Sequence, residues 1–467
     1  MKIISFSRLA LVYLLCSTGT SLFAQTDDSL MIRRIADHIL LNGKSYEDLR
    51  HLTKQIGARL AGSPGMVKAE KWGLKTMEEA GAEKAWMQAC MVPNWKRGGK
   101  DEAYAVGVVT SHSGKSVGRQ SLDVVALGNS MGTGSKGIKA PVIEVSSFDD
   151  LEKKKDEIKG KIVFYNYKFD ARYIHTFKAY SEASQYRGSG PSRAAKYGAV
   201  GVIVRSMSHS TDNNPHTGST RYDSAYAKIP AVAIGLRDAD WLSTKLSSKK
   251  FDVFIRTNGH FRPDTIGHNI IGEIRGSEFP DEIITVGGHL DSWDNCEGAH
   301  DDGAGCVQTI EILRTFKALG YKPKRTIRFV LFANEENGLR GGNKYAEEAK
   351  AKNEKHIFAL ESDAGGFTPR GFGFTVSDEQ YNKLLQWKSL IAPYGACEFI
   401  RGGGGADIGP LNRQLGTAVA GFIPDSQRYF DIHHARNDVF ENVNKRELEL
   451  GAVNMAALIY LVDKYGM

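Results

Sequence analysis

Residues 287–305 read GGHLDSWDNCEGAHDDGAG and hold a His-x-Asp and an Asp-Asp pair in one short segment. The His-x-Asp follows an apolar run, and the Asp-Asp stands before a glycine that opens a helical pattern. Farther along the chain lie Glu335-Glu336, Asp363 and His434. Together these residues supply imidazole and carboxylate ligands for two metal ions and leave one carboxylate free to act as a general base.

The residue types suit a hydrolytic centre with two divalent ions. Such ions lie about 3.5 to 4 Å apart and need one bridging carboxylate, further ligands on each side, and a place for a water that loses a proton near neutral pH. Imidazole and carboxylate suit zinc, and no paired cysteines stand nearby to form a closed structural site. In an Asp-Asp or Glu-Glu pair, one carboxylate can bind metal while its neighbour takes another role.

A predicted strand and helix place the first two motifs. Residues 282–288 form a buried strand that runs into His289. The two-residue period of a strand puts Asp291 on the same side, so we expect Asp291 to orient the imidazole and count it as a catalytic candidate. Apolar residues then recur at helical spacing, which puts Asp301 and Asp302 at or just before a helix N-terminus.

Two further predicted strands carry the other carboxylates. Residues 325–333 (RTIRFVLFA) deliver Glu335 and Glu336 at their carboxyl end, and residues 356–360 (HIFAL) deliver Asp363. Ligands of an open α/β sheet bind in the crevice outside the carboxyl ends of its strands. We therefore expect all these side chains to meet in one crevice.

The order and local sequence of these groups resemble the co-catalytic di-zinc aminopeptidase family. The likeness extends to PNWKRG at residues 93–98, ESD at 361–363 and YFDIHH at 429–434, and covers nearly the whole chain after residue 24. It implies an α/β zinc exopeptidase domain with a mixed sheet, helices on both faces and two zinc ions per chain. It also allows a homodimer.

The resemblance assigns a role to each site residue. It implies five metal ligands: His289 and Asp363 on one zinc, Glu336 and His434 on the other, and Asp301 bridging both. Glu335 would be the base that takes a proton from the water between the ions and passes it to the leaving amine. Of two adjacent histidines, His434 fits better than His433 because the family ligand stands four residues before an aspartate, here Asp438.

The resemblance further implies exopeptidase action on dipeptides or short peptides with free termini. Aminopeptidase, dipeptidase and carboxypeptidase action are all open. Two other functions must be weighed: a single-zinc glutaminyl cyclase, which resembles this family in fold, and an inactive receptor-like binding protein. The full set of five ligands favours hydrolysis over the cyclase, and the presence of every ligand and of the base disfavours the binding protein.

Length and the N-terminal residues predict an exported protein of two domains. The chain has 467 residues, more than one core normally serves. Residues 1–24 carry Lys2 and Arg8, an apolar stretch at 9–15 and a small residue at Ala24, as a signal peptide does. The stretch is far shorter than the roughly 20 residues that span a bilayer, so a membrane anchor is disfavoured. A periplasmic or extracellular location follows, and no later segment is apolar enough to span a membrane.

Charge and cysteine content narrow the range of partners. Without residues 1–24 the net charge falls from +7 to +5, with 59 Lys and Arg against 54 Asp and Glu. The positive surplus is small, and the sequence has no block of basic residues. We therefore expect no nucleic-acid partner, and we expect the ligands to be short peptides. The cysteines at 90, 296, 306 and 397 are too few for a disulfide framework but allow one bridge.

An insertion at residues 117–259 separates an N-terminal part of the peptidase domain, residues 25–116, from the catalytic part, residues 260–467. The insertion reads as short strands between Gly, Ser and Asp turns, at 122–126, 140–145, 161–165, 199–204 and 229–234. It resembles the β-rich protease-associated domain of several secreted peptidases, a plain structural insertion being the alternative. We expect it to pack over the zinc crevice and limit substrate length without supplying a catalytic residue.

Two features stay outside the predicted catalytic set. RGGGGAD at residues 401–407 can bring the backbone close to a substrate and Asp407 to its amino group, with a flexible surface loop as the alternative. Tyr429 can donate a hydrogen bond to a developing oxyanion, with simple packing as the alternative.

Overall fold

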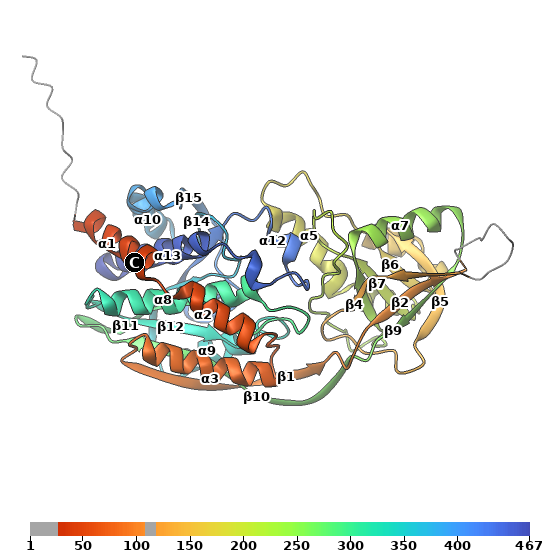
Figure 1. Ribbon diagram of the computed structural model, residues 1–467, viewed down its shortest axis with the longest axis horizontal. Coiled ribbons are helices and arrows are strands. Elements are labelled where there is room, and N and C mark those ends of the chain that lie inside the picture. Colours follow the sequence, from red (N-terminus) through yellow and green to blue (C-terminus); the bar gives the residue numbers. More distant parts are fainter. Residues whose placement is uncertain (1–26, 108–117) are drawn as a thin grey trace, which may run out of the picture.

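Two mixed sheets of eight strands each organise the chain. The computed structural model describes residues 27–107 and 118–467, and the predicted signal peptide lies outside them. The unit that holds the first sheet occupies one end of the long axis, and the unit built on the second sheet occupies the other (Figure 1). Within the described residues, no helix is long and apolar enough to cross a membrane.

The first sheet has the order β1-β10-β12-β11-β13-β16-β14-β15. Its strands are β1 (Lys84–Lys96), β10 (His260–Ile274), β11 (Phe279–His289), β12 (Arg325–Phe332), β13 (Lys355–Glu361), β14 (Pro369–Thr375), β15 (Glu398–Arg401) and β16 (Ala418–Pro424). The neighbours β12, β11, β13 and β16 run parallel, so their carboxyl ends meet at one edge. The three strands predicted from residue 282 onward are β11, β12 and β13.

Helices cover both faces of this sheet. Alternate residues of β12 show the two faces, because Phe329 and Leu331 join the core on one side and Val330 and Phe332 join the core on the other. On the first face lie α1 (Asp27–Asn42), α3 (Pro64–Glu79), α8 (Ala304–Ala318), α10 (Asp378–Ile391) and α13 (Lys445–Tyr465), with α2 (Ser45–His51) against α8. On the second lie α9 (Arg340–Ala351) and α11 (Gly409–Leu415). The predicted α/β class with helices on both faces is confirmed.

The N-terminal helix α1 packs against the last helix, α13 (Figure 1). Its Asp28 accepts hydrogen bonds from the Tyr460 hydroxyl at 2.8 Å, the Lys464 ammonium at 2.6 Å and the Tyr465 hydroxyl at 2.6 Å. The side chain of Asn444 caps the start of α13 by accepting from the backbone N–H of Glu447. The beginning and the end of the chain therefore complete one domain.

The second sheet has the order β3-β2-β9-β5-β6-β7-β8-β4. Its strands are β2 (Glu102–Val106), β3 (Arg119–Leu122), β4 (Val124–Ala126), β5 (Ile138–Val145), β6 (Ile162–Tyr165), β7 (Gly201–Arg205), β8 (Ala231–Ile234) and β9 (Asp252–Arg256). The five strand segments predicted for the insertion all have counterparts here. The sheet also takes in β2, which lies upstream of the predicted start at residue 117, because β2 pairs with β9.

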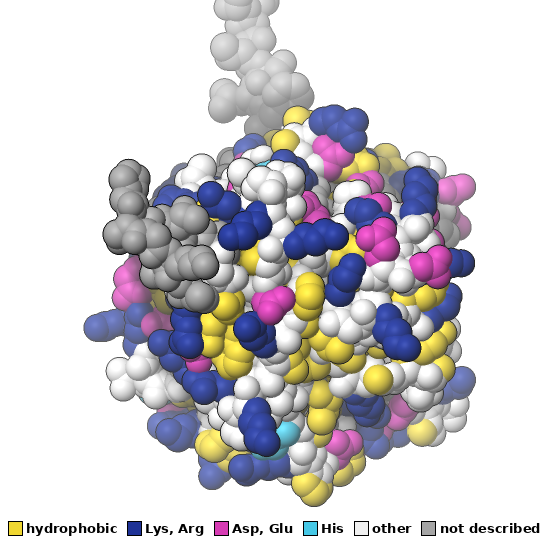
Figure 2. Space-filling view, turned by 90° about the vertical axis from the view of Figure 1, so that its right-hand side faces the viewer, with side chains coloured by type: hydrophobic (Ala, Val, Ile, Leu, Met, Phe, Trp, Pro, Cys, Tyr) yellow, Lys and Arg dark blue, Asp and Glu magenta, His cyan; other side chains and the backbone are white. Residues whose placement is uncertain are grey.

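The insertion contains more helix than its sequence suggested. Its helices are α4 (Phe148–Lys153), α5 (Thr176–Gly188), α6 (Gly190–Lys196) and α7 (Leu236–Ser248). α4 lies in the connection from β5 to β6, and α5 and α6 lie in the connection from β6 to β7; both connections join parallel neighbours, which require a crossover. Figure 2 shows the far end of this unit, where lysine and arginine side chains are spread among acidic and polar ones.

Long antiparallel strands and aromatic contacts join the two units. β1 and β10 carry the chain into and out of the insertion (Figure 1). At their junction, the indole of Trp95 donates to the Ser130 carbonyl at 2.9 Å and meets Trp293 edge-on at 6.5 Å between ring centroids. α5 of the insertion lies beside α12 (Tyr429–Ile432) of the first unit, where Phe177 stacks on Tyr429 at 5.5 Å.

The remaining helical elements are short turns. The short π-helices are η1 (Leu52–Ile56) and η3 (Ala299–Gly303), and the 3-10 turns are η2 (Lys155–Glu157), η4 (Ala392–Tyr394) and η5 (Phe440–Asn442).

The four cysteines of the described segments, at positions 90, 296, 306 and 397, are all unpaired. The single bridge that the sequence allowed is therefore not formed among them.

A buried arginine holds the loop that follows β11. Arg59 is fully buried and donates from Nε to the Leu290 carbonyl at 2.5 Å, from Nη1 to the Glu297 carbonyl at 2.6 Å and from Nη2 to the Gly298 carbonyl at 2.8 Å. A guanidinium suits this task because its donors point in fixed directions from one plane. The loop from the end of β11 to η3 is thereby tied to the N-terminal part of the chain.

Replacing Arg59 should destabilise the fold. Arg59→Met keeps much of the stem but removes a donor from three main-chain carbonyls; Gly298 keeps the Gly303 N–H as a partner, while Leu290 and Glu297 lose theirs, at about 1 to 3 kcal/mol each. The free energy of unfolding, measured by urea denaturation, should therefore fall by at least about 2 kcal/mol. Arg33→Met, at an exposed position on α1, is the control and should stay within about 0.5 kcal/mol of the wild type. Equal stability of the two variants would show that the carbonyls find other partners.

Candidate metal centre

Side chains from the parallel strands meet at the carboxyl edge of the first sheet. His289 ends β11, Glu335 and Glu336 follow β12, and Asp363 follows β13. His434 comes after β16, just beyond α12. The structure thus brings together residues that lie far apart in the chain, at the place where an open α/β sheet binds its ligands.

Asp301 stands between the two imidazoles of this group. It lies in η3, directly before α8, and a cis peptide bond joins it to Asp302. Its Oδ1 is 3.2 Å from Nε2 of His289, and its Oδ2 is 3.2 Å from Nε2 of His434. One carboxylate oxygen therefore faces each imidazole, the arrangement expected of a bridging ligand.

Each imidazole has a second carboxylate beside it. Nε2 of His289 is 3.4 Å from Oδ1 of Asp363, and Nε2 of His434 is 3.1 Å from Oε2 of Glu336. The side chains form two sets, one around each imidazole, and Asp301 belongs to both. This is the grouping that the family resemblance implied.

Several atoms of the centre are buried without a hydrogen-bond partner. They include Nε2 of His289, Oδ2 of Asp301 and Oε1 of Glu336. Buried polar atoms are nearly always bonded, so this group of unpartnered nitrogen and oxygen atoms suits a cation as its partner. Imidazole nitrogen and carboxylate oxygen are the donors that zinc takes, and these residues fit that ion.

Burial and mutual charge perturb the titration of these groups. Burial, with the charge of Asp301, raises the pKa of Glu336 to about 7. Burial opposes protonation of His434, but the carboxylates of Glu336 and Asp301 raise its pKa to about 10. Protons are therefore held by the same atoms that would bind metal, and metal binding must displace them.

The predicted base, Glu335, differs from its neighbour Glu336. Among the described residues, no hydrogen bond is made to the carboxylate of Glu335. Glu335 is partly exposed, whereas Glu336 is buried. Burial, with the charges of Asp363 and Glu336, raises the pKa of Glu335 well above its ordinary value. A carboxylate that binds a proton more readily and stays untied can act as a base or an acid.

Asp291 orients two parts of the centre, although not in the way its spacing predicted. The Nδ1 of His289 lies 3.0 Å from the main-chain carbonyl oxygen of Asp291 and 3.7 Å from its Oδ1. The carboxylate instead accepts from the backbone N–H groups of Glu335 at 3.0 Å and Glu336 at 3.3 Å. Asp291 therefore directs the imidazole through its carbonyl and holds the Glu335-Glu336 turn through its side chain.

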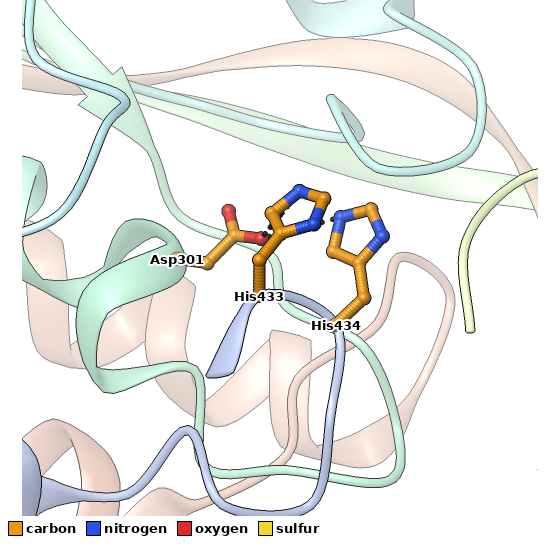
Figure 3. A group of neighbouring side chains, drawn as sticks. All are labelled: Asp301, His433 and His434. Carbon is orange, nitrogen blue, oxygen red and sulfur yellow. Dashed lines mark ion pairs between the residues drawn. The ribbon is translucent and has the colours of Figure 1, made fainter. Parts of the chain in front are cut away.

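The two adjacent histidines are distinguished by their neighbours. Their rings stack at 3.5 Å between centroids, and Nε2 of His433 is 3.6 Å from Oδ2 of Asp301 against 3.2 Å for His434 (Figure 3). His434 also approaches Glu336, while the ring of His433 is packed against Tyr180, Tyr429 and Phe430. The distances favour His434 as the ligand, as the sequence did.

Two aspartates hold the centre without having been predicted to do so. Asp302 accepts from the backbone N–H of His289 at 3.0 Å and of Gly305 at 2.9 Å, which ties the end of β11 to the start of α8. Asp438 accepts from the N–H of Asp301 at 3.2 Å and of His300 at 2.8 Å. Asp302 had a sequence signal, an acid before a helix. Asp438 had only its spacing from His434.

Asp302 is also a candidate ligand by position. With His289 and Asp363 it forms a group whose ligand atoms lie within 4.8 Å of one another. Both of its oxygens already accept backbone hydrogen bonds, however, whereas Nε2 of His289 has no such partner. The position and hydrogen bonds of Asp302 therefore fit a residue that holds the backbone around the centre and does not bind metal itself.

A cavity of about 620 Å³ opens beside Asp363. Phe422 and Ile400 line it, and Phe177 and Lys178 of α5 add a wall from the insertion. Residues 402–405 form another side, so the glycine segment borders this cavity. Gly403 comes so close to the neighbouring strand that a Cβ there would lie 2.9 Å from the backbone of β14.

Asp407 lies away from that cavity wall. It is fully buried, and its backbone N–H donates to Oε2 of Glu361 at 3.1 Å. Burial, with the charge of Glu361, raises the pKa of Asp407 well above its ordinary value. The glycine segment thus borders the cavity, while the aspartate that follows it is part of the domain interior.

The mixed sheet, the crevice at its strand ends and the acidic cluster with two imidazoles are those of an α/β metallopeptidase. Residues 269–459 match the family model described as Peptidase family M28. The chain is 34% identical to carboxypeptidase Q of Homo sapiens over 420 residues, 90% of this chain and 85% of that protein. The chain belongs to peptidase family M28, which confirms the family resemblance of its sequence.

Other relatives agree over most of their length. Carboxypeptidase Q of Xenopus laevis is 33% identical over 444 residues, 95% of this chain and 91% of that protein. A peptidase M28 precursor from Shewanella amazonensis has a solved structure with a TM-score of 0.87 and 32% identity, covering 93% of this chain and 96% of that one. A zinc aminopeptidase from Bacillus subtilis shares the fold at a TM-score of 0.63 and 21% identity, over 91% of this chain and 94% of that one.

Proposed function

We propose that this peptidase is an exported, zinc-dependent exopeptidase that hydrolyses dipeptides and short peptides with free termini. One observation carries the proposal: Asp301 presents one carboxylate oxygen to each of two imidazoles, both at 3.2 Å, and each imidazole has a further carboxylate at its side. The relatives named carboxypeptidase Q support the peptidase class. Export rests on residues 1–24.

Two zinc ions would be held by five side chains: His289 and Asp363 on one, Glu336 and His434 on the other, and Asp301 on both. When bound, zinc supplies a Lewis acid that polarises a carbonyl group and lowers the pKa of water. The chain supplies the orientation. The hydrogen bond from Nδ1 of His289 to the Asp291 carbonyl leaves Nε2 free to face the centre.

Glu335 is the proposed general base. Its carboxylate is free of hydrogen bonds in the described residues, and the Asp291 carboxylate holds its backbone N–H at 3.0 Å. The position of Glu335 is therefore fixed while its side chain stays available. In the reaction it takes a proton from the attacking water and gives it to the leaving amine, so the peptide bond breaks as the new carboxylate forms.

The negative charge of the proposed centre suits short substrates with a free amino terminus. The carboxylates of the centre outnumber its imidazoles, so a protonated amino group is attracted. The insertion, which we assign as a protease-associated domain, places Phe177 and Lys178 on one side of the cavity beside Asp363. In this proposal that wall limits how much peptide can lie beyond the scissile bond.

Zinc content tests the proposed centre directly. The purified wild type should carry about two zinc ions per chain, measured by atomic emission, whereas one would favour a cyclase and none a binding protein. Asp301→Asn should weaken both sites together, because a neutral amide bridges two cations poorly. Asp281→Asn, at an exposed position on β11, is the matched control and should keep both ions. Loss of a single ion from Asp301→Asn would show that Asp301 does not bridge.

Glu335→Gln separates the base from the ligands. The variant should keep nearly all of its zinc but lose about 10²- to 10⁴-fold in kcat, since an amide cannot accept the proton. Glu347→Gln, on the exposed face of α9, should retain wild-type turnover. If Glu335→Gln lost zinc instead, Glu335 would have to be placed among the ligands.

Substrate termini form the third test. Unblocked dipeptides should be cleaved far faster than their N-acetylated forms or than intact proteins, because acetylation removes the ammonium that the acidic centre attracts. The comparison is kcat/KM for matched pairs of free and acetylated dipeptides. Similar values within each pair would contradict the proposed exopeptidase action.

A further inference from the structure

The insertion touches the proposed zinc ligand His434 directly. The carbonyl oxygen of Thr217 lies 3.3 Å from Nδ1 of that imidazole, and the Thr217 backbone N–H donates to the His434 carbonyl at 3.0 Å. Nη1 of Arg187 lies 3.3 Å from the same Nδ1. All these contacts join residues of different units, which lie more than two hundred positions apart in the chain.

The backbone of His434 needs such support. Its φ is 60°, in the left-handed region that residues with a side chain seldom adopt. A residue keeps this conformation where its surroundings hold it. Besides Thr217, the side-chain amide of Asn295 donates to the His434 carbonyl at 3.3 Å. The ring is thus set by contacts from outside its own segment.

Arg187 holds the segment of the insertion that contacts His434. It is 8% exposed, and among the described residues its guanidinium bonds to uncharged groups and forms no ion pair with a carboxylate. Nη1 donates to the Thr217 carbonyl at 3.2 Å, and Nη2 donates to the Tyr180 hydroxyl at 2.6 Å. The guanidinium packs so closely on the backbone of Gly218 that a Cβ there would lie 2.4 Å from Cζ.

The two neighbours of Nδ1 suit opposite tautomers of His434, and a metal ion held by Nε2 would require the tautomer with its proton on Nδ1. Arg187 is only a donor, so Nη1 can bond to Nδ1 only when Nδ1 is unprotonated, whereas the Thr217 carbonyl can accept only from a protonated Nδ1. The Thr217 carbonyl has two lone pairs and can accept from both Nη1 of Arg187 and Nδ1 of His434. With its proton on Nδ1, the imidazole turns the lone pair of Nε2 toward Asp301 and Glu336.

We propose that Thr217 and Arg187 are positioning residues for His434: the Thr217 carbonyl accepts the Nδ1 proton of the metal-binding tautomer, and Arg187 holds that carbonyl in place. The insertion then forms part of the metal centre, in addition to any effect on substrate length. This inference rests on the proposed zinc function. Metal-binding histidines usually donate their other N–H to such a partner, and loss of the partner typically weakens metal binding about 10- to 100-fold.

The test compares zinc binding in the full-length protein. Arg187→Met should bind one of its two zinc ions about 10- to 100-fold more weakly in a chelator competition, while the ion beside His289 and Asp363 keeps its affinity. Cobalt substitution gives a second readout, since the visible spectrum of one ion should change and that of the other should not. Arg172→Met is the matched control, because Arg172 is an exposed arginine of the insertion paired with Asp170, and it should bind both ions as the wild type does.

Two more conservative variants test the inference even if Arg187→Met does not fold. Tyr180→Phe removes only the hydroxyl that accepts from Nη2, and it should weaken the same ion by a smaller factor. Arg187→Lys keeps the charge and one donor toward Thr217, so it should recover part of the lost affinity. If Arg187→Met does not fold, unchanged zinc affinity in Tyr180→Phe overturns the inference.

The outcomes separate this inference from the function on which it rests. A wild type without two zinc ions would refute the proposed centre and, with it, the role of Arg187. A wild type with two ions and an Arg187→Met variant that binds both with unchanged affinity would refute the positioning role alone. Selective weakening of one ion supports both.

Discussion

One aspartate that must serve two imidazoles sets the requirements for the rest of the structure. The oxygens of Asp301 reach His289 and His434 only if its backbone is held in place, and Asp438 does this by accepting the Asp301 N–H. Asp302, the next residue, binds the backbone at the end of β11 and at the start of α8. The strand, the helix and the short turn between them are therefore arranged around one carboxylate.

The same requirement explains why so many acids lie together. Carboxylates at the ends of adjacent parallel strands repel one another, and burial makes each charge more costly. The fold supplies few cations to offset them, since Arg59 is occupied with main-chain carbonyls and Arg187 lies on the far side of the His434 ring from Asp301. Bound metal is the group that would balance this charge, which links the stability of the centre to its proposed chemistry.

The two units share this centre. The peptidase domain provides the candidate ligands, while the insertion contacts the back of one of them through Thr217 and provides a cavity wall through Phe177. The long strands β1 and β10 and the contact of α5 with α12 fix the position of the two units relative to each other. An insertion that looks separate in sequence is, in space, continuous with the site.

The sequence alone determined the central strands and the identity of the clustered residues, because these depend on short-range periodicity and on which residues end a strand, while the helices on both faces followed from the family resemblance. Residues 282–289 show this, since the apolar run at 282–288 predicts the buried strand that ends in His289. Tertiary structure decided which atom of Asp291 meets His289, the inclusion of β2 in the second sheet, and the contacts of Arg187 and Thr217 with His434. Such contacts join segments far apart in the chain, and only the packing of the two units brings them together.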